Sequence, residues 1–163
     1  MKYLLLIRHA KTEQYGYDTD FERELTNRGI DDCKLMSSRI KKIKFVPDLV
    51  KISTAKRTRQ TAKHLAKHLD WNKEIIEGLD KLYLASYQVI FNEIANTKNN
   101  IDSLAIIAHN PGITYLFNSI GNATIDNLPT CGMGLFKFEI KDWKDIKIKK
   151  GQLEWYSWPK KED

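Results

Sequence analysis

The chain has 163 residues and a mass of 19.0 kDa, and 42% of its residues are hydrophobic while 29% are charged. This composition supports one domain with a hydrophobic core and excludes a compositionally disordered chain. Two cysteines, Cys33 and Cys131, exclude a disulfide scaffold and a four-cysteine zinc site. We therefore expect a single domain that spans residues 1–163.

The formal net charge is +6, but the lysines are scattered along the chain rather than gathered in one block. We interpret them as surface charges that favour anions, and we expect neither nucleic acid nor a membrane as partner. The aromatic cluster of Trp143, Trp155, Tyr156 and Trp158 is interpreted as packing for the terminal strands. The first apolar run stops at Arg8, which is too short for a membrane span or a secretory signal, so we expect a cytoplasmic protein.

Short apolar runs alternate with segments of helical periodicity, a pattern typical of an α/β domain. In the first half we expect a buried parallel strand over Tyr3–Ile7 and a polar loop over Lys11–Glu24. The remaining elements of this half are a helix capped by Thr26 or Asn27 that reaches Ile43, a strand over Leu49–Ile52, and a helix over Lys56–Leu69 capped by Ser53 or Thr54.

The second half continues this alternation and then changes character. We expect a strand over Glu74–Ile76, a helix over Ser86–Ala95, a strand over Ser103–Ala108 and a helix over Ile113–Ile120 that stops at Gly121. The last segments, Gly134–Ile140 and Gln152–Ser157, alternate and are rich in aromatic residues, so they are expected to form hairpin-like or edge strands.

Two histidines occupy the same predicted setting, because His9 follows the first strand and His109 follows the strand over 103–108. Ligands of parallel sheets bind at the carboxyl ends of the strands, so these residues are expected to meet. Arg8 is adjacent to His9, and Arg57 follows the second strand closely. Guanidinium groups bind phosphate oxygens through paired hydrogen bonds, so the set predicts a pocket for a phosphoryl group.

The chemistry of such a pocket follows from the neutral imidazole, which is a competent nucleophile toward phosphorus. The arginines should lower the reference pKa of ~6.5 and so favour the neutral form. A helix that begins at Pro111 would add backbone N–H groups for an anion. This chemistry needs no metal or cofactor. His64 and His68 have an i, i+4 spacing that can bind zinc, but no third ligand is evident, and we predict no metal site.

Three segments resemble the motifs of the histidine phosphatase superfamily, which is also called phosphoglycerate-mutase-like. The similar segments, in chain order, are Leu6–Thr12 with its Arg-His-Ala triplet, Ser53–Ala62 with an arginine before a Gln-Thr pair, and Ile107–Gly112 with the second histidine. Arg23–Gly29 and Leu128–Thr130 are similar to stretches of the short SixA-like branch, with Glu24 where that branch has proline.

The resemblance implies a three-layer α/β/α sandwich with a mostly parallel central sheet. It also implies a phosphohistidine intermediate on His9, with Arg8, Arg57 and His109 around the phosphoryl group. Arg23 and Asn110 are the further substrate contacts that it implies. Larger members carry a Glu or Asp that protonates the leaving group; Asp80 and Glu77 lie in about the right region, although each is also compatible with an ordinary loop carboxylate.

The implied substrate is phosphohistidine on a protein, such as a histidine phosphotransfer domain, and the implied enzyme is a monomeric, metal-independent phosphatase. An imidazole leaving group is less basic than an alkoxide and needs less acid assistance. Two alternatives stay open. The protein is then either a phosphomonoesterase acting on a small phosphorylated metabolite, or a module that binds phosphorylated ligands without turnover.

Overall fold

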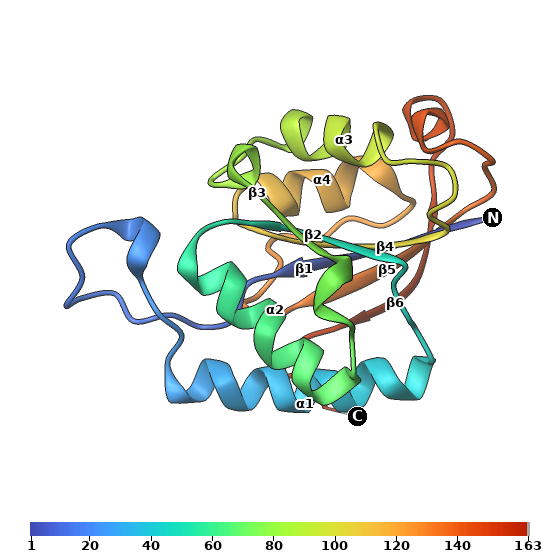
Figure 1. The fold of residues 1–163 in the computed structure, drawn as a ribbon. Helices are drawn as coiled ribbons and strands as arrows, with labels where there is room; N and C mark the ends of the chain where they lie inside the picture. Colours follow the sequence, from blue (N-terminus) through green and yellow to red (C-terminus); the bar gives the residue numbers. More distant parts are fainter. Residues whose placement is uncertain (163) are drawn as a thin grey trace.

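The computed structural model describes residues 1–162, and its centre is a six-stranded sheet with the order β3-β2-β4-β1-β5-β6 (Figure 1). β1, β2, β3 and β4 are parallel, while β5 and β6 run antiparallel to their neighbours. The strands are β1 (Lys2–Arg8), β2 (Leu49–Ser53), β3 (Ile76–Leu79), β4 (Ser103–Ala108), β5 (Met133–Phe138) and β6 (Gln152–Ser157).

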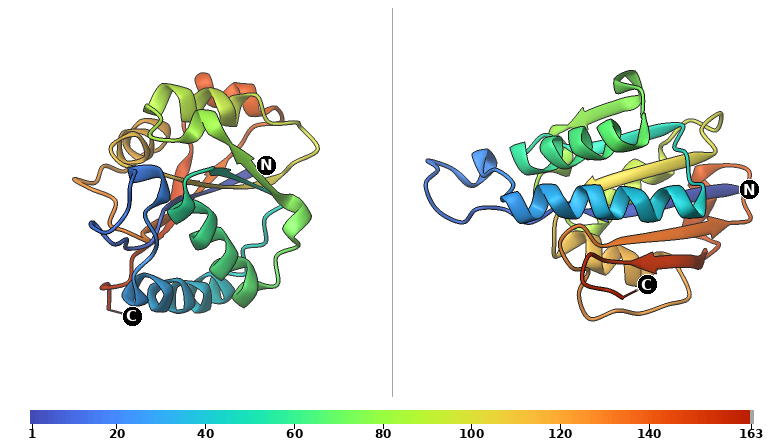
Figure 2. Two further views of the ribbon diagram at one scale, coloured as in Figure 1. Left: turned by 60° about the vertical axis from the view of Figure 1, so that its left-hand side comes forward. Right: turned by 90° about the horizontal axis from the view of Figure 1, so that it is seen from below.

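Helices cover both faces of this sheet. α1 (Asn27–Ile43) and α2 (Lys56–Leu69) lie on one face, and α3 (Tyr87–Ala95) and α4 (Gly112–Ile120) lie on the other (Figures 1 and 2). Short 3-10 turns cover Asp20–Glu22, Lys73–Ile75, Asp80–Leu82 and Trp143–Lys147. The three-layer α/β/α sandwich with a mostly parallel sheet is therefore confirmed.

The apolar run of β1 supplies both cores, because successive side chains of a strand point to opposite faces. Leu4 and Leu6 join the cluster under α3 and α4, whereas Leu5 and Ile7 join the cluster under α1 and α2. All four side chains have no exposed surface. The expected buried strand is confirmed, and it pairs in parallel with β4 and antiparallel with β5.

Pairing of β1 with β4 brings distant parts of the sequence together at one edge of the sheet. The register places Arg8 opposite Ala108, and β2 flanks β4 on its other side. His9, His109 and the end of β2 at Ser53 therefore share one rim. The segment between β1 and α1, which contains the turn Asp20–Glu22, projects beyond this rim (Figure 1).

Most predicted helix boundaries are confirmed, but the cap of α2 is wrong. Thr26 Oγ1 accepts a hydrogen bond from the Gly29 N–H at 2.9 Å and caps α1 as expected. The residue before α2 is Ala55, which offers no side-chain cap. Ser53 instead ends β2, where its hydroxyl accepts from the Ala55 N–H and contacts His109.

One strand prediction also needs correction. Residues 73–75 form a 3-10 turn, and β3 begins at Ile76, where the predicted strand ended. Pairing with β2, from Val50 opposite Ile76 to Ser53 opposite Leu79, holds the later residues extended in spite of Gly78. The hairpin-like or edge strands expected at the end of the chain are confirmed, because β5 and β6 pair antiparallel and β6 lies at the edge of the sheet.

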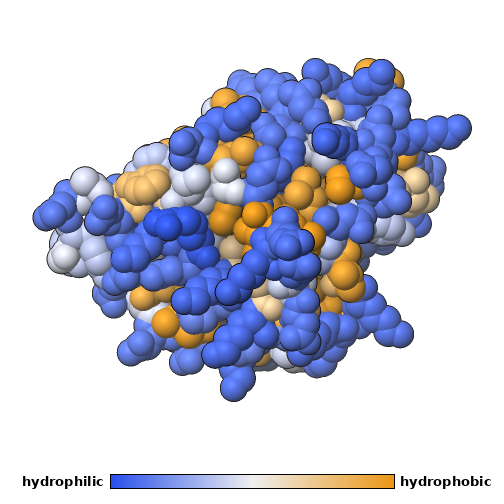
Figure 3. Space-filling view, in the orientation of Figure 1, coloured by the Kyte–Doolittle hydropathy of each residue, from blue (hydrophilic) through white to orange (hydrophobic). Residues whose placement is uncertain are grey.

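The surface and the aromatic cluster complete the fold. Hydrophilic residues dominate the face seen in Figure 3, with hydrophobic residues in a band across its middle. Within residues 1–162, no helix combines the length and the apolar character needed to cross a membrane. Trp143 is fully buried and donates its indole N–H to the Ile101 carbonyl at 2.7 Å, which confirms a packing role. Trp158 has a different place, described below.

Candidate active site

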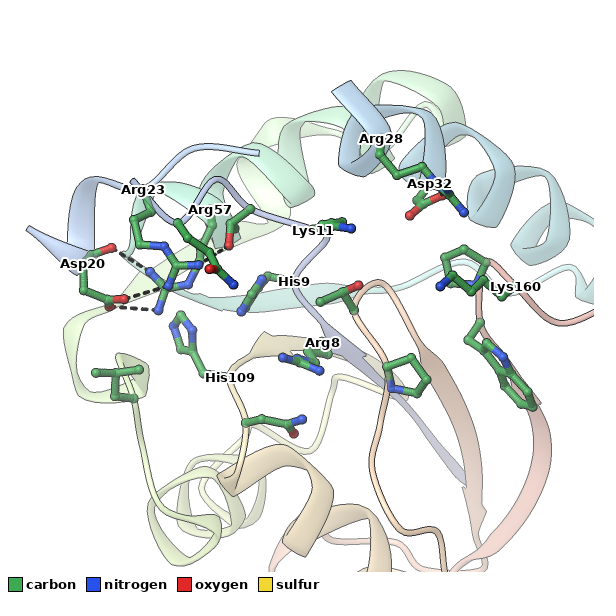
Figure 4. Close-up of a pocket in the computed structure, with 18 residues that line it drawn as sticks. Arg8, His9, Lys11, Asp20, Arg23, Arg28, Asp32, Arg57, His109 and Lys160 are labelled. Carbon is green, nitrogen blue, oxygen red and sulfur yellow. Dashed lines mark hydrogen bonds and ion pairs between the residues drawn. The ribbon is translucent and has the colours of Figure 1, made fainter. Parts of the chain in front are cut away.

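A cavity of about 590 Å³ opens at the carboxyl rim of the sheet, where β1 and β4 end. Figure 4 shows its charged lining residues converging from several segments. His9 and His109 lie at one end with the arginines, and Arg28, Asp32 and Lys160 lie at the other. We call these the phosphoryl end and the far end of the cavity.

His9 follows β1 and is 7% exposed. Its Nδ1 lies 2.8 Å from the Ala10 carbonyl oxygen. Because a carbonyl can only accept, Nδ1 carries the proton and Nε2 keeps its lone pair. Burial, assisted by the charges of His109 and the arginines, lowers the pKa of His9 to about 3. The imidazole is therefore neutral at pH 7, the state that a nucleophile requires.

His109 follows β4 and faces His9, with 5.3 Å between the ring centroids. Its Nε2 lies 2.7 Å from the Ser53 hydroxyl. Burial first, and then the charge of Arg57, lowers its pKa to about 3. Within residues 1–162 the buried Nδ1 has no hydrogen-bond partner. A neutral His109 that accepts from Ser53 would offer this Nδ1–H as a donor.

Arg8 and Arg57 reach the same end of the cavity from β1 and from the first turn of α2. Arg8 donates to the Leu128 carbonyl at 3.0 Å, and Arg57 is only 2% exposed. The Nε of each arginine is buried and has no partner in the described part of the chain. Both residues line the cavity, so they place two guanidinium charges beside the imidazoles, where they favour an oxyanion.

Asp20 is the carboxylate at the phosphoryl end of the cavity, and sequence analysis did not identify it. Its backbone oxygen and its Oδ2 accept from Arg57 at 2.8 and 3.0 Å, and its Oδ1 accepts from Arg23 at 3.0 Å. Tyr83 donates its hydroxyl to Oδ2 at 2.5 Å. Partial burial raises the pKa of Asp20, but the hydrogen bonds from Tyr83, Arg23 and Arg57 outweigh it and lower the pKa to about 2. The spacing Asp20-x-x-Arg23 was the available signal.

Arg23 and Asn110 both line the cavity. Besides its contact with Asp20, Arg23 donates to the Glu13 carbonyl at 2.8 Å and to the Thr12 hydroxyl. The Asn110 amide donates to Asn127 at 2.8 Å and accepts from Thr114 at 2.6 Å. Both side chains therefore hold neighbouring loops in place in this structure.

Asp80 and Glu77 do not line the cavity. Asp80 accepts a hydrogen bond from the Thr54 hydroxyl at 2.6 Å, and Glu77 is an exposed residue of β3, the edge strand. The structure thus separates both candidate general acids from the two imidazoles, and neither enters the mechanism proposed below.

Lys11, Arg28, Trp158 and Lys160 also line the cavity. Figure 4 shows Arg28 and Lys160 at the far end and the Lys11 side chain pointing toward that end. Sequence analysis interpreted Trp158 as packing and the lysines as surface charges. Trp158 does pack against Tyr156, with ring centroids 4.8 Å apart, yet it also forms cavity wall. The position of Trp158 directly after β6 was the signal, but the course of the tail depends on tertiary contacts.

Among residues 1–162, no three His, Cys, Asp or Glu side chains are grouped so as to hold a metal ion. His64 and His68 are half-buried on α2 rather than fully solvent-facing. Neither lines the cavity.

Comparison with known families identifies the family of this chain. The family model described as "Histidine phosphatase superfamily (branch 1)" matches residues 4–101, more than half of the chain. The chain belongs to the histidine phosphatase superfamily. With phosphatases among its structural neighbours, this membership makes the protein a phosphatase.

Several known proteins are similar to this phosphatase over most of their length. The uncharacterized protein Rv1276c of Mycobacterium tuberculosis is 25% identical over 150 residues, covering 86% of this chain and 91% of that one. The structure of the protein histidine phosphatase SixA with tungstate superposes with a TM-score of 0.82 at 21% identity, covering 96% and 97% of the chains. A putative SixA from Nakamurella multipartitia gives 0.83 at 19% identity, covering 98% and 97%.

A more distant match is the mycobacterial glucosyl-3-phosphoglycerate phosphatase Rv2419c, with a TM-score of 0.64 and 11% identity over 94% and 97% of the chains. These structural similarities establish the SixA-like fold. They do not choose between a phosphoprotein and a small phosphate ester as substrate.

Proposed function

We propose that this phosphatase hydrolyses phosphohistidine on a protein through a phosphohistidine intermediate on His9. The observation that carries the proposal is the meeting of Arg8, Arg57 and His109 in one cavity with the neutral His9, whose ring centroid lies 5.3 Å from that of His109. Two guanidinium groups and an imidazole around a neutral imidazole suit a tetrahedral phosphoryl group.

The first step forms a bond from His9 Nε2 to phosphorus and breaks the bond from phosphorus to the substrate nitrogen. Arg8, Arg57 and His109 bind the transferring oxygens as charge shifts, because phosphoryl transfer depends on positioning and electrostatic stabilisation. The substrate imidazole, protonated on its other nitrogen, leaves as a neutral ring and needs no general acid. This accounts for a site in which neither Asp80 nor Glu77 is close.

In the second step water attacks phosphorus, the bond to His9 Nε2 breaks, and orthophosphate leaves. The Ala10 carbonyl keeps the proton on Nδ1 throughout, so Nε2 is restored as a free base. No step requires a metal. We propose that the enzyme acts as a cytoplasmic monomer. We also propose that residues 1–163 form one domain, and the single sheet with its two covering layers supports this second point.

The test is to trap the intermediate. Brief incubation with labelled phosphohistidine in the presence of chelator should label the wild-type protein with phosphate that is stable in base and labile in acid. His9→Ala should take up no label and should lose turnover while it keeps its circular dichroism spectrum. Label that persists in His9→Ala would refute the nucleophile.

A panel of substrates then tests the substrate class. Phosphohistidine peptides should give a higher kcat/KM than an aryl phosphate or a sugar phosphate. A sugar phosphate that exceeds the peptides would favour the small-molecule phosphomonoesterase, and binding without any phosphate release would favour the non-catalytic module.

A further inference from the structure

The backbone segments that carry Lys11 and Lys160 are each held against α1. Lys11 lies in the segment after β1, and its carbonyl accepts the Thr26 N–H at 2.9 Å. A Cβ on Gly29 would stand 2.3 Å from that carbonyl oxygen, so only glycine permits this approach of α1. The backbone that carries Lys11 is thus fixed against the start of α1.

Lys160 is fixed from the opposite side of the cavity. The buried Arg39 of α1 donates to the carbonyls of Trp158 at 2.6 Å and Lys161 at 2.8 Å, and to the Ser157 hydroxyl at 3.1 Å. These bonds hold the segment on both sides of Lys160 against α1. Trp158, Pro159 and Lys160 then form one wall of the cavity.

The excess charge at this end comes from the two lysines. Arg28 is paired with Asp32 at 3.4 Å, which leaves that pair nearly neutral. Lys11 and Lys160 are exposed, and neither forms an ion pair within residues 1–162. Two unpaired ammonium groups in the same cavity as the phosphoryl site attract a second negative group on the substrate.

The lining favours a protein over a small metabolite as the source of that group. Charged and imidazole side chains make up more than half of the lining, and the aromatic Trp158 and the apolar Leu84 and prolines are among the rest. One apolar side chain of the cavity rim, Leu84, is 55% exposed, and Tyr87 and Tyr115, which do not line the cavity, are 37% and 57% exposed on α3 and α4. The rings of Tyr87 and Tyr115 contact each other, with centroids 6.5 Å apart.

Leu84 adds a second sign of an interaction surface. Its φ of 49° places a branched side chain in the left-handed region, which bulky residues rarely occupy. Such strained positions are concentrated at binding sites. An exposed leucine on the rim and a cationic end on one cavity match the surface of a partner protein better than they match a metabolite.

We propose that Lys11 and Lys160 bind carboxylate side chains that lie next to the phosphohistidine on the substrate protein. This inference rests on the proposed function and adds its specificity: the substrate is a protein whose phosphohistidine is presented beside an acidic surface. The lysines take no part in the chemical step. They raise the affinity for the acidic substrate and leave the turnover of bound phosphohistidine unchanged.

The experiment compares two phosphohistidine peptides of equal length, one with Asp and Glu around the phosphohistidine and one with Asn and Gln at the same positions. Wild-type protein should favour the acidic peptide about fivefold in kcat/KM, the value expected for two exposed charge contacts. The variant Lys11→Gln/Lys160→Gln should reduce this ratio to about one through KM. Free phosphohistidine should be turned over equally by both proteins.

A matched control removes two lysines at the opposite edge of the sheet. Lys98 and Lys144 are exposed, and Lys98→Gln/Lys144→Gln changes the net charge by the same amount. It should keep the fivefold ratio, because a general loss of positive charge is not the cause. A ratio of one in the wild type, or an unchanged ratio in Lys11→Gln/Lys160→Gln, would overturn the proposal.

Two further outcomes separate this inference from the proposed function. If a nucleoside monophosphate is turned over faster than either peptide and is slowed by loss of the two lysines, the far end serves a small anion and the proposal is wrong. If wild-type protein turns over neither phosphohistidine peptide, the proposed function fails. The peptide ratio is then measured as binding of non-hydrolysable phosphonate analogues, which still tests the lysines.

Discussion

The two ends of the cavity differ in burial and in the way their charged groups are held. At the phosphoryl end, His9, Arg57 and His109 are 7%, 2% and 2% exposed, and hydrogen bonds to the backbone or to neighbouring side chains fix each of them. At the far end, Lys11 and Lys160 are exposed and only their backbones are fixed.

This difference separates chemistry from recognition. A nucleophile and the groups that stabilise charge need one protonation state and one direction, and burial supplies both. Groups that meet a partner surface do better when they remain hydrated and mobile, since they act through long-range attraction and adapt to the partner. Removal of one positive charge should therefore lower kcat/KM for a small substrate much more at the phosphoryl end than at the far end.

The largest contrast should come from removing one cation at each end. Arg57→Gln should lower kcat/KM for an aryl phosphate by about 10³, because one preorganised donor to the transferring group is lost. Lys160→Gln should leave this small substrate unaffected. Steady-state kinetics on both variants at one salt concentration makes the measurement, and equal losses would remove the distinction between the ends.

Acid should lower the free energy of unfolding through the two imidazoles of the phosphoryl end. The pKa values of His9 and His109 are about 3 in the folded protein, against ~6.5 in an unfolded chain. Between those values the unfolded state binds more protons, so the free energy of unfolding falls as pH drops below about 6.5. From pH 7 to pH 5 the loss should be about 2 kcal/mol for each imidazole.

Urea unfolding at the two pH values measures this effect. In His9→Asn the asparagine does not titrate, so its decrease from pH 7 to pH 5 should be smaller than that of the wild type. Ring nitrogen signals in NMR should also show both imidazoles neutral at pH 5. A wild-type decrease that His9→Asn reproduces in full would show that the burial of His9 does not depress its pKa.

Substitution of Arg39 tests whether binding at the far end depends on the wall formed by Trp158, Pro159 and Lys160. Arg39→Met keeps most of the side-chain stem but removes the hydrogen bonds to Ser157, Trp158 and Lys161, and it should lower the free energy of unfolding by about 2 kcal/mol. The preference for the acidic peptide should weaken, while aryl phosphate turnover at saturating substrate should persist. Loss of both activities together would show that the wall also supports the catalytic end.

The phosphoryl end was largely predictable from the sequence, and the far end was not. His9 and His109 follow continuous apolar runs, and a buried strand with a polar residue at its end is a local signal that needs no knowledge of the rest of the fold. Arg8 and Arg57 lie within a few residues of strand ends for the same reason. Sequence spacing thus translated directly into spatial proximity through parallel pairing.

Lys11, Trp158 and Lys160 meet only because the tail after β6 turns back over α1, which is secured by Arg39 from the middle of that helix. No local pattern encodes such a contact. The α2 cap was mispredicted for a related reason, since the Ser53 hydroxyl contacts His109 across the sheet. Tertiary contacts override a local propensity where a functional site recruits the residue.

Asp20 was also not predicted, because its role depends on tertiary contacts. Its substitution should give a smaller change in activity than that of Arg57, and the sign of that change is informative. Its carboxylate accepts from Arg23, Arg57 and Tyr83, so it either directs the guanidinium groups toward the phosphate or competes with phosphate for them. Figure 4 shows the Arg57 head group between Asp20 and His9, which favours the directing role. Asp20→Asn should then weaken inhibition by orthophosphate and lower kcat/KM about tenfold, mainly through KM, because a charge-assisted hydrogen bond is lost.

The sign of the Asp20→Asn effect decides between the two roles. Asn keeps the shape and accepts a hydrogen bond but carries no charge, so a merely structural role would leave the inhibition constant for orthophosphate unchanged. Tighter binding of orthophosphate in Asp20→Asn would show a competing internal anion. In that case the substrate phosphate would have to displace Asp20 from Arg23 and Arg57, whereas Lys11 and Lys160 at the far end have no carboxylate partner among residues 1–162 to displace.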